Sequence, residues 1–300
     1  MDISANIQIF LLIFSRVASI LWLLPLFSSR AVSVPFKAGL SLLIAYLLFD
    51  SMTVDRSFSS DPYFLLQGRN SMDTPVFAGD LTKIYSEGKV EVKAVSSVGL
   101  ELHEGEMVGL FGPSGSGKTT LLSLIGCILR PTSGSLKLYG IETNSLGEAA
   151  LPGIRKKFIS FIFQGFNLFP ALTALENVML VLKLKGVVEN AEEKAKEMLD
   201  SVGLSDRMHF LPRDLSGGEK QRVAIARSLA ADSPIILADE PTGNLDQGNG
   251  RKVMELLKQL ATERKKCIFA ATHDNRVEGI FDRILYMEDG MIIREKGGHA

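Results

Sequence analysis

Cysteine and net charge are scarce in this 300-residue sequence. Its two cysteines, Cys127 and Cys267, have no further cysteine or histidine near them at the spacing of metal ligands. This excludes a disulfide scaffold and a zinc ribbon, and a reducing cytosol is the expected compartment. The formal net charge is only −1, which argues against a protein that coats nucleic acid.

Glycine is scarce only in the first 75 residues of the sequence. That part holds Gly39 and Gly68 and 10 charged side chains, whereas the remaining 225 residues hold 25 glycines and 57 charged side chains. The sequence also lacks internal repeats and low-complexity tracts. The two parts are therefore different objects, and chemistry that needs glycine-rich turns belongs to the second part.

The first part contains two apolar stretches. Residues 7–27 carry one charge, Arg16, and are long enough to cross a bilayer core as a helix. Residues 36–49 are too few for a full span and predict a half-span, a re-entrant segment or the arm of a buried hairpin. A cleavable signal peptide is disfavoured because Asp2 stands where basic residues would be expected. Residues 50–75 are polar and predict a linker or a fusion junction.

Residues 1–49 closely resemble the amino terminus of FliR, a family of flagellar export-gate proteins. The resemblance rests on the runs NIQIFLLIFSRVASILWLLPLFSS and KAGLSLLIAYLLF. Members of that family continue with several further hydrophobic segments, and none appears here. We therefore expect residues 1–75 to be a passenger, left by a gene fusion or a gene-model error, that takes no part in the mechanism of the second part.

The second part alternates strand-like and helical patterns, which is typical of a layered α/β domain. A short apolar strand, Met107–Phe111, is followed by the phosphate-loop pattern GxxxxGK[ST] and by an apolar helix expected over 121–129. The expected nucleotide-binding residues of this loop are Gly112, Pro113, Ser114, Gly115, Ser116, Gly117, Lys118, Thr119 and Thr120. The strand before the loop and the helix after it argue against a glycine-rich turn with a chance lysine.

The residue types of this loop fit a triphosphate. Glycines let the backbone N–H groups turn inward around phosphates, and the helix that follows adds partial positive charge. We expect Lys118 to reach the β- and γ-phosphates and the Thr119 hydroxyl to bind Mg²⁺.

A second apolar strand ends in two carboxylates, Asp239 and Glu240. We expect Asp239 to hold Mg²⁺, directly or through water, and Glu240 to act as the general base that polarises the attacking water. The alternative is a strand that runs into a solvated acidic turn, and the phosphate loop about 120 residues earlier argues against it.

The segment LSGGEKQR opens a helix expected to run to about Leu229. Ser216 and Glu219 form an S-x-x-E capping box, which alone would explain both residues. Gly217 and Gly218 are not explained in this way, because each glycine in a helix costs about 1 kcal/mol relative to alanine. We expect a phosphate to approach their N–H groups closely.

The motifs GPSGSGKTT, LSGGEKQR, IILADEP and ATHD, in residues 76–290, resemble those of ATP-binding-cassette (ABC) ATPases. The resemblance implies an α/β P-loop NTPase core with an antiparallel β subdomain and a helical subdomain at about 165–215, so that residues 76–300 form one ATPase domain. It also implies that Ser216, Gly217 and Gly218 contact the γ-phosphate of ATP held by a second subunit.

The same resemblance assigns roles to four further residues. Gln164 takes a catalytic and Mg²⁺-proximal place that also contacts the transporter, Asp246 lies in the D-loop near the nucleotide, and His273 reads the γ-phosphate. Tyr85 provides a platform for adenine. The structural alternatives are a satisfied histidine after an apolar strand and a tyrosine that packs at a strand end.

The phrases VEVKAV, CILRPTSG, FNLFPALTALENV and PTGNLD resemble the subgroup that serves lipoprotein release and macrolide export. This implies a homodimer that binds two ATP with Mg²⁺, hydrolyses ATP and drives a separate membrane permease from the cytoplasmic face of the bacterial inner membrane. No nucleic-acid partner is expected. Phe163, Phe166 and Phe169 around Gln164 are expected either in the core or at the rim that receives the permease.

Two other functions are weighed. A flagellar protein-export component would account for the first part and leave the ATPase motifs unexplained. A non-transport ABC ATPase would separate its motifs by a long coiled coil or carry two ATPase units, and the sequence has neither.

Overall fold

The computed structural model describes residues 74–88 and 90–297, all of which belong to one compact unit, residues 64–300. The apolar stretches at 7–27 and 36–49, the FliR-like residues 1–49 and nearly all of the junction at 50–75 lie outside the described residues. Among the residues that are described, no helix has both the length and the apolar character needed to span a membrane.

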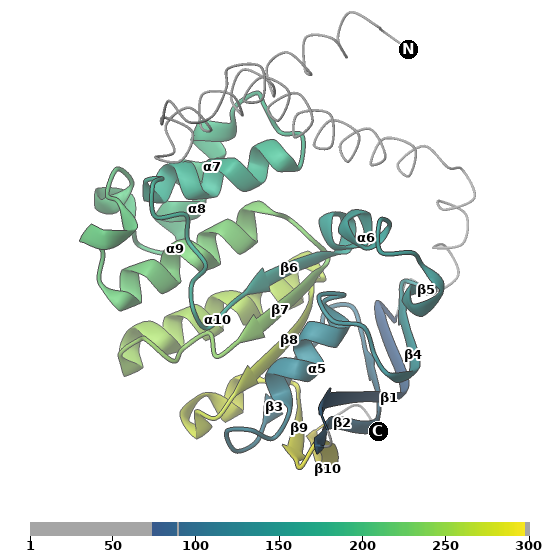
Figure 1. Cartoon of the computed structure of the whole chain (residues 1–300). Helices are drawn as coiled ribbons and strands as arrows, with labels where there is room; N and C mark the ends of the chain where they lie inside the picture. Colours follow the sequence, from purple (N-terminus) through teal and green to yellow (C-terminus); the bar gives the residue numbers. More distant parts are fainter. Residues whose placement is uncertain (1–73, 89, 298–300) are drawn as a thin grey trace, which may run out of the picture. The chain divides into compact units, whose positions relative to one another are not determined.

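The larger sheet has six strands in the order β10-β9-β3-β8-β7-β6 (Figure 1). Neighbouring strands from β9 to β6 run parallel, and β10 pairs antiparallel with β9. The strands are β3 (Met107–Phe111), β6 (Ile159–Ile162), β7 (Ile235–Asp239), β8 (Cys267–Thr272), β9 (Arg283–Glu288) and β10 (Met291–Gly297). Every residue of β3, β7 and β8 is buried, as expected for apolar central strands of a parallel sheet covered on both faces.

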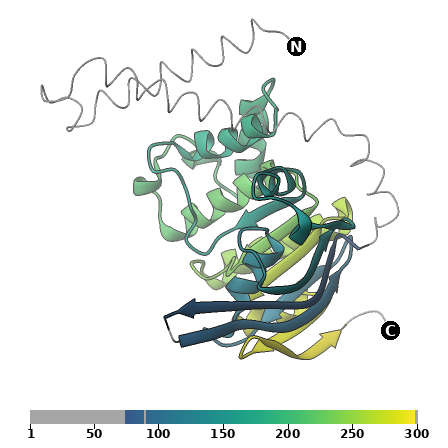
Figure 2. The ribbon, with the colours of Figure 1, turned by 45° about the vertical axis from the view of Figure 1, so that its right-hand side comes forward.

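The smaller sheet is antiparallel, in the order β2-β1-β4-β5. Its strands are β1 (Val76–Glu87), β2 (Val90–Leu102), β4 (Ser133–Leu138) and β5 (Ile141–Glu142). Figure 2 shows β1 and β2 as a long hairpin, in dark blue. The two sheets meet where the N–H of Ser96 in β2 donates to the carbonyl of Gly290, in the turn before β10, at 2.8 Å.

Some of the helices lie against the sheets, and the others form a helical group. They are α5 (Lys118–Ile125), α6 (Leu151–Phe158), α7 (Ala174–Leu184), α8 (Ala191–Ser201), α9 (Gly217–Ala230) and α10 (Gln247–Arg264). Helix α5 contacts β7 and β8 of one sheet and β1 and β2 of the other, so it lies between the sheets. Helices α7, α8 and α9 pack against one another (Figure 1). The α/β core, the antiparallel β subdomain and the helical subdomain of the sequence prediction are confirmed.

Side-chain caps fix where three of these helices begin. Thr173 with Glu176 and Ser216 with Glu219 form capping boxes at α7 and α9, and Asp246 caps α10. The helical group shares its core with the sheet, because buried side chains of α7 and α9 join those of β7, β8 and α10 in one apolar cluster.

The helix after the phosphate loop is shorter than the sequence predicted. It starts at Lys118 and ends at Ile125, not at residue 129. Gly126 closes the helix, Cys127 has a positive φ of 52°, and the N–H groups of Ile128 and Leu129 both donate to the carbonyl of Ser123. The apolar pattern continues past the helix because Gly126 and Cys127 stay buried in this turn, although Ile128 is exposed.

Candidate active site

Four neighbouring parallel strands end at one edge of the larger sheet and deliver most of the predicted site residues there. The register pairs Phe111 with Thr272, Ala271 with Asp239, and Ala238 with Ile162. From these ends the chain continues into the phosphate loop after β3, His273 after β8, Glu240 after β7 and Gln164 after β6. The carboxyl edge of a parallel sheet is where such folds bind ligands.

The phosphate loop is held so tightly that two of its positions admit only glycine. A Cβ on Gly112 would lie 2.1 Å from the carbonyl oxygen of Met287 in β9. Gly117 has a φ of 101°, and a Cβ there would lie 2.2 Å from the carbonyl oxygen of Ala94 in β2. Both sheets therefore fix the shape of the loop, which is the cradle that a phosphate group requires.

Lys118 lies inside this loop. Its ammonium donates to the carbonyls of Gly112 at 2.8 Å and Pro113 at 2.9 Å, and the residue is only 7% exposed. Burial lowers the pKa of Lys118, and the nearby carboxylates of Glu240 and Asp239 act in the opposite direction. A cation placed in this way is suited to phosphate oxygens.

Thr119 and Asp239, which lie 120 positions apart in the sequence, meet at the start of α5. The Thr119 hydroxyl donates to Oδ1 of Asp239 at 3.2 Å. Burial raises the pKa of Asp239, and the hydrogen bond from Thr119 opposes this effect. A hydroxyl beside a buried carboxylate is an oxygen pair of the kind that Mg²⁺ accepts. Within the described residues there is no group of three or more His, Cys, Asp or Glu side chains that could hold a metal by itself.

Glu240 and His273 are joined directly. Nδ1 of His273 donates to Oε1 of Glu240 at 2.8 Å, and the buried hydroxyl of Thr272 donates to Oε2 of the same carboxylate at 3.3 Å. Glu240 is 8% exposed and has a φ of 50°, an uncommon value for a residue other than glycine. Backbone strain together with two side-chain bonds is typical of a residue held for function.

Gln164 lies at the same edge, exposed, two residues after β6. The backbone carbonyl of Gln164 accepts a hydrogen bond from Nδ2 of Asn244 at 3.4 Å. Of the three phenylalanines around it, Phe163 stacks on Phe161 with ring centroids 4.2 Å apart, whereas Phe169 is 52% exposed. One aromatic is therefore engaged by a neighbouring ring, and another is available at the surface.

The signature segment lies on a different element, at the start of α9 in the helical group. Ser216 and Glu219 complete the predicted capping box, with hydrogen bonds of 2.8 and 3.2 Å within the first turn. A Cβ on Gly217 would meet open space, but one on Gly218 would lie 3.3 Å from Cδ2 of Leu245. Gly217 thus leaves room for an approaching group, whereas the lack of a side chain at Gly218 is also explained by its close packing against Leu245.

Two other predicted residues lie away from the phosphate loop in the sequence and have local contacts. Asp246 accepts the N–H of Asn249 at 3.0 Å as the cap of α10, and this bond lowers its pKa. Tyr85 stands near the end of β1 and is 42% exposed, with Nζ of Lys83 located 5.4 Å from its ring centroid. Its ring therefore has an open face.

Some residues of the site were not singled out from the sequence. Thr272 is the second partner of Glu240. Arg227 of α9 donates to the carbonyls of Phe166 and Asn167, which ties the helix of the signature to the loop after Gln164. Sequence spacing carries no signal for these contacts, because each depends on where separate elements meet.

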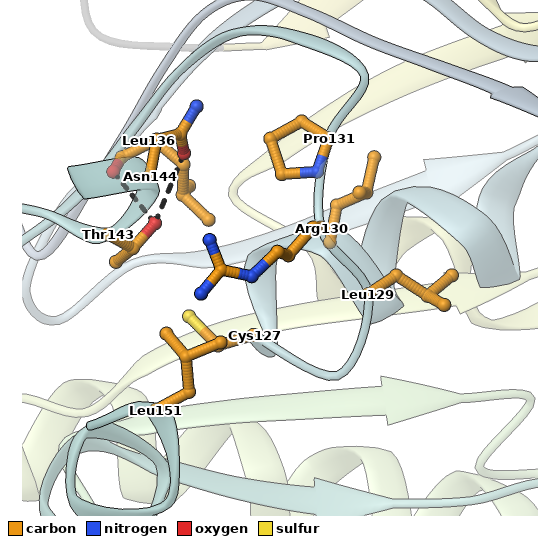
Figure 3. A pocket seen from close by; sticks show the side chains of 9 residues that line it. Cys127, Leu129, Arg130, Pro131, Leu136, Thr143, Asn144 and Leu151 are labelled. Carbon is orange, nitrogen blue, oxygen red and sulfur yellow. Dashed lines mark hydrogen bonds between the residues drawn. The ribbon is translucent and has the colours of Figure 1, made fainter. Parts of the chain in front are cut away.

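A separate cavity of about 210 Å³ lies beyond the end of α5, lined by Cys127, Arg130, Thr143, Leu151 and their neighbours. Figure 3 shows the Arg130 guanidinium between Thr143 and Cys127. Arg130 is engaged by the carbonyl of Leu146 and by Glu148. Burial raises the pKa of Cys127 to about 11, and Cys267 is also a buried free thiol.

Comparison with known families gives two matches. The family described as ABC transporter matches residues 95–243, and the family described as bacterial export proteins, family 1, matches residues 7–73. Both agree with the resemblances identified from the sequence.

Among individual proteins, an uncharacterized ABC transporter ATP-binding protein of Methanocaldococcus jannaschii, MJ0796, is 46% identical over 222 residues, covering 72% of this chain and 94% of that protein. The lipoprotein-releasing system ATP-binding protein LolD of Geobacter metallireducens is 42% identical over 217 residues, covering 72% of this chain and 96% of LolD. The macrolide export ATP-binding/permease protein MacB of Rhodospirillum rubrum is 42% identical over 222 residues, covering 74% of this chain and 34% of MacB.

A solved structure agrees with the fold. A dimeric post-hydrolysis state of MJ0796 bound to ADP and Pi has a TM-score of 0.72 and 44% identity, covering 75% of this chain and 99% of that chain. With the phosphate loop, the two carboxylates and the signature helix on the elements described above, the chain belongs to the family of ABC transporter ATP-binding proteins.

Proposed function

We propose that this ABC ATPase binds ATP with Mg²⁺ between two copies of itself and uses hydrolysis to drive a separate membrane permease. The observation that carries the proposal is the arrangement at one sheet edge. Lys118, the Thr119–Asp239 pair and the Glu240–His273 pair lie there together, while the signature stands on another element. The residues proposed for the nucleotide site therefore come from the ends of several strands of the larger sheet and from the start of α9.

The first part of the site would hold the nucleotide. The phosphate loop offers backbone N–H groups and Lys118 to the phosphates, and Thr119 with Asp239 would hold Mg²⁺, with Gln164 nearby. When bound, the ion neutralises charge on the phosphate oxygens. The exposed ring of Tyr85 would stack on adenine.

Glu240 would take the proton of the attacking water. The hydrogen bonds from His273 and Thr272 orient its carboxylate toward the sheet edge where the phosphates would lie. His273, with a side chain that is 66% exposed, would sense the γ-phosphate while it holds Glu240.

The signature would complete the site of a second copy. The open space at Gly217 and the partial positive charge at the start of α9 suit a phosphate from outside the chain. Asp246, at the start of α10, would lie near the same interface. The dimeric state of the similar MJ0796 cassette supports this assembly.

The partner in the membrane would be a permease for export, or for lipoprotein or lipid release. The similarity to LolD and MacB and the exposed Phe169, in the loop that follows Gln164, support this choice. The protein would then act at the cytoplasmic face of the bacterial inner membrane. In this assignment residues 76–300 form the ATPase domain, with 1–49 as a hydrophobic segment and 50–75 as a junction.

A second candidate function rests on the match of residues 7–73 to bacterial export proteins. In that case the chain would act with a flagellar export gate. Affinity capture of the full chain from membranes would separate the two proposals, since it would recover either a permease or export-gate proteins.

The ATPase assignment is tested by phosphate release at increasing ATP concentration. Glu240→Gln should lower the rate of ATP hydrolysis at least about 100-fold while ATP still binds, because the general base is lost and the phosphate loop is intact. Glu263→Gln, the same change at an exposed position of α10, is the control and should hydrolyse ATP at the normal rate. Turnover by Glu240→Gln close to that of the control would refute the role of Glu240.

A further inference from the structure

The proposed function brings the γ-phosphate of ATP to the start of α9, and a carboxylate, that of Glu219, already lies there. Glu219 lies in the first turn of α9, and its Oε2 accepts the N–H of Ser216 at 2.8 Å. This bond, the Ser216 hydroxyl and Arg207 lower the pKa of Glu219, so the side chain is ionised at neutral pH. A negative charge favours the start of a helix, but it repels a phosphate that approaches the same N–H groups.

Arg207 is held against this carboxylate. Its Nε lies 3.0 Å from Oε1 of Glu219, and its guanidinium carbon lies 4.8 Å from the ring centroid of Phe210. The side chain of Glu219 is 20% exposed and that of Arg207 is 47% exposed, so the pair is open to an approaching partner. Both residues line a surface depression of about 460 Å³, together with Gly203, Ser205 and Asp206.

We propose that Arg207 is a positioning residue for nucleotide-driven dimerisation: it neutralises Glu219, so that the first turn of α9 can accept the γ-phosphate of ATP held by a second copy of this chain. The inference rests on the proposed function of the signature segment. Without Arg207, the Glu219 carboxylate would meet the incoming phosphate without its neutralising partner, in a depression that Asp206 also lines.

Fold stability is a weaker reason for the pair. An ion pair with a half-exposed partner contributes little to the free energy of unfolding. Like charges brought together at an interface reduce affinity much more, and this effect is sensitive to salt. Arg207 should therefore influence association more than folding.

The test measures the apparent Kd of the ATP-dependent dimer by analytical ultracentrifugation. The protein is the full chain with Glu240→Gln, so that ATP is not consumed. Arg207→Met should weaken the dimer about tenfold at low salt, and adding Glu219→Gln should restore it to within about threefold, because glutamine keeps the capping box without the charge. Arg207→Lys should stay within about threefold of the parent. Arg213→Met, a change at a 78% exposed arginine just before the signature, is the matched control.

Each outcome bears on the inference. Arg207→Met with the affinity of the parent would overturn it, as would a double variant as weak as Arg207→Met, because Arg207 would then act by something other than neutralising Glu219. If Arg207→Met does not fold, Arg207→Lys and the double variant are measured instead. An apparent Kd about tenfold weaker than that of the parent, for either variant, contradicts the proposal. A parent that fails to dimerise with ATP would instead refute the proposed function.

Discussion

At the scale of single residues, the chemistry depends on side chains that meet from distant parts of the chain. Thr119 bonds to Asp239 across 120 positions, and Glu240 bonds to His273 and Thr272 across 33 and 32 positions. These contacts form because β3, β7 and β8 are adjacent and parallel. The Thr272 hydroxyl is the least obvious of them, and it suggests an experiment.

Thr272→Val should lower the kcat of ATP hydrolysis about five- to tenfold, with little change in KM, because Glu240 loses one of the two bonds that orient it. The hydroxyl also accepts the N–H of Asp274 at 3.1 Å, which valine cannot do. Thr262→Val, at an exposed position of α10, is the control. If Thr272→Val raised KM and left kcat unchanged, Thr272 would act on substrate binding instead.

The site residues that could be predicted from the sequence are those that belong to a contiguous motif. Lys118 and Thr119 follow from the phosphate-loop spacing, and Glu240 follows from its place after a buried strand. Thr272 and Arg227 could not be predicted in this way, because their partners are set by strand register and by helix packing. Motif spacing records local chain geometry, whereas these contacts depend on the assembled fold.

At the scale of elements, the loop between Gln164 and α7 is organised from within the helical group. Asn177 of α7 is fully buried. Its side chain accepts the N–H of Phe169 at 2.8 Å and donates to the carbonyls of Phe169, Leu172 and Thr173. Arg227 of α9 holds the preceding residues, so two helices fix this loop beside Gln164.

Asn177→Ala should therefore reduce the free energy of unfolding by about 2–4 kcal/mol, because four hydrogen bonds are lost and the N–H of Phe169 and the carbonyl of Leu172 lose their side-chain partner. Urea denaturation of the full chain, followed by circular dichroism, measures this change. Lys183→Ala, at an exposed position of the same helix, should shift the transition by less than about 0.5 kcal/mol. Equal shifts for the two variants would contradict the role given to Asn177.

Element boundaries were predictable where a cap or a clear period marks them. Helix α7 (Ala174–Leu184) lies within the predicted helical subdomain, and the Thr173–Glu176 box starts it. The end of α5 was missed because the apolar pattern continues through Gly126 and Cys127, where the backbone turns. Periodicity reports burial, and a buried turn can extend it beyond the helix.

At the scale of the whole molecule, two family matches divide the chain near residue 75. We predict that a chain starting at Ser71 hydrolyses ATP with kcat and KM within about twofold of the full chain, because every site residue lies in the second part. Steady-state phosphate release by both proteins, in the same detergent, measures this. Loss of folding or of hydrolysis on removal of residues 1–70 would show that the first part belongs to the ATPase.

The central claim is that each nucleotide site is completed by a second copy of the chain, and the molar mass of the full-length Glu240→Gln protein tests it most directly. Light scattering should show a monomer without nucleotide and a doubled protein mass with ATP and Mg²⁺, because the signature of one copy then closes on the phosphate loop of the other. The further change Lys118→Ala should abolish the doubling. A Glu240→Gln protein that stays monomeric with ATP and Mg²⁺, or that doubles regardless of ATP, would contradict the account.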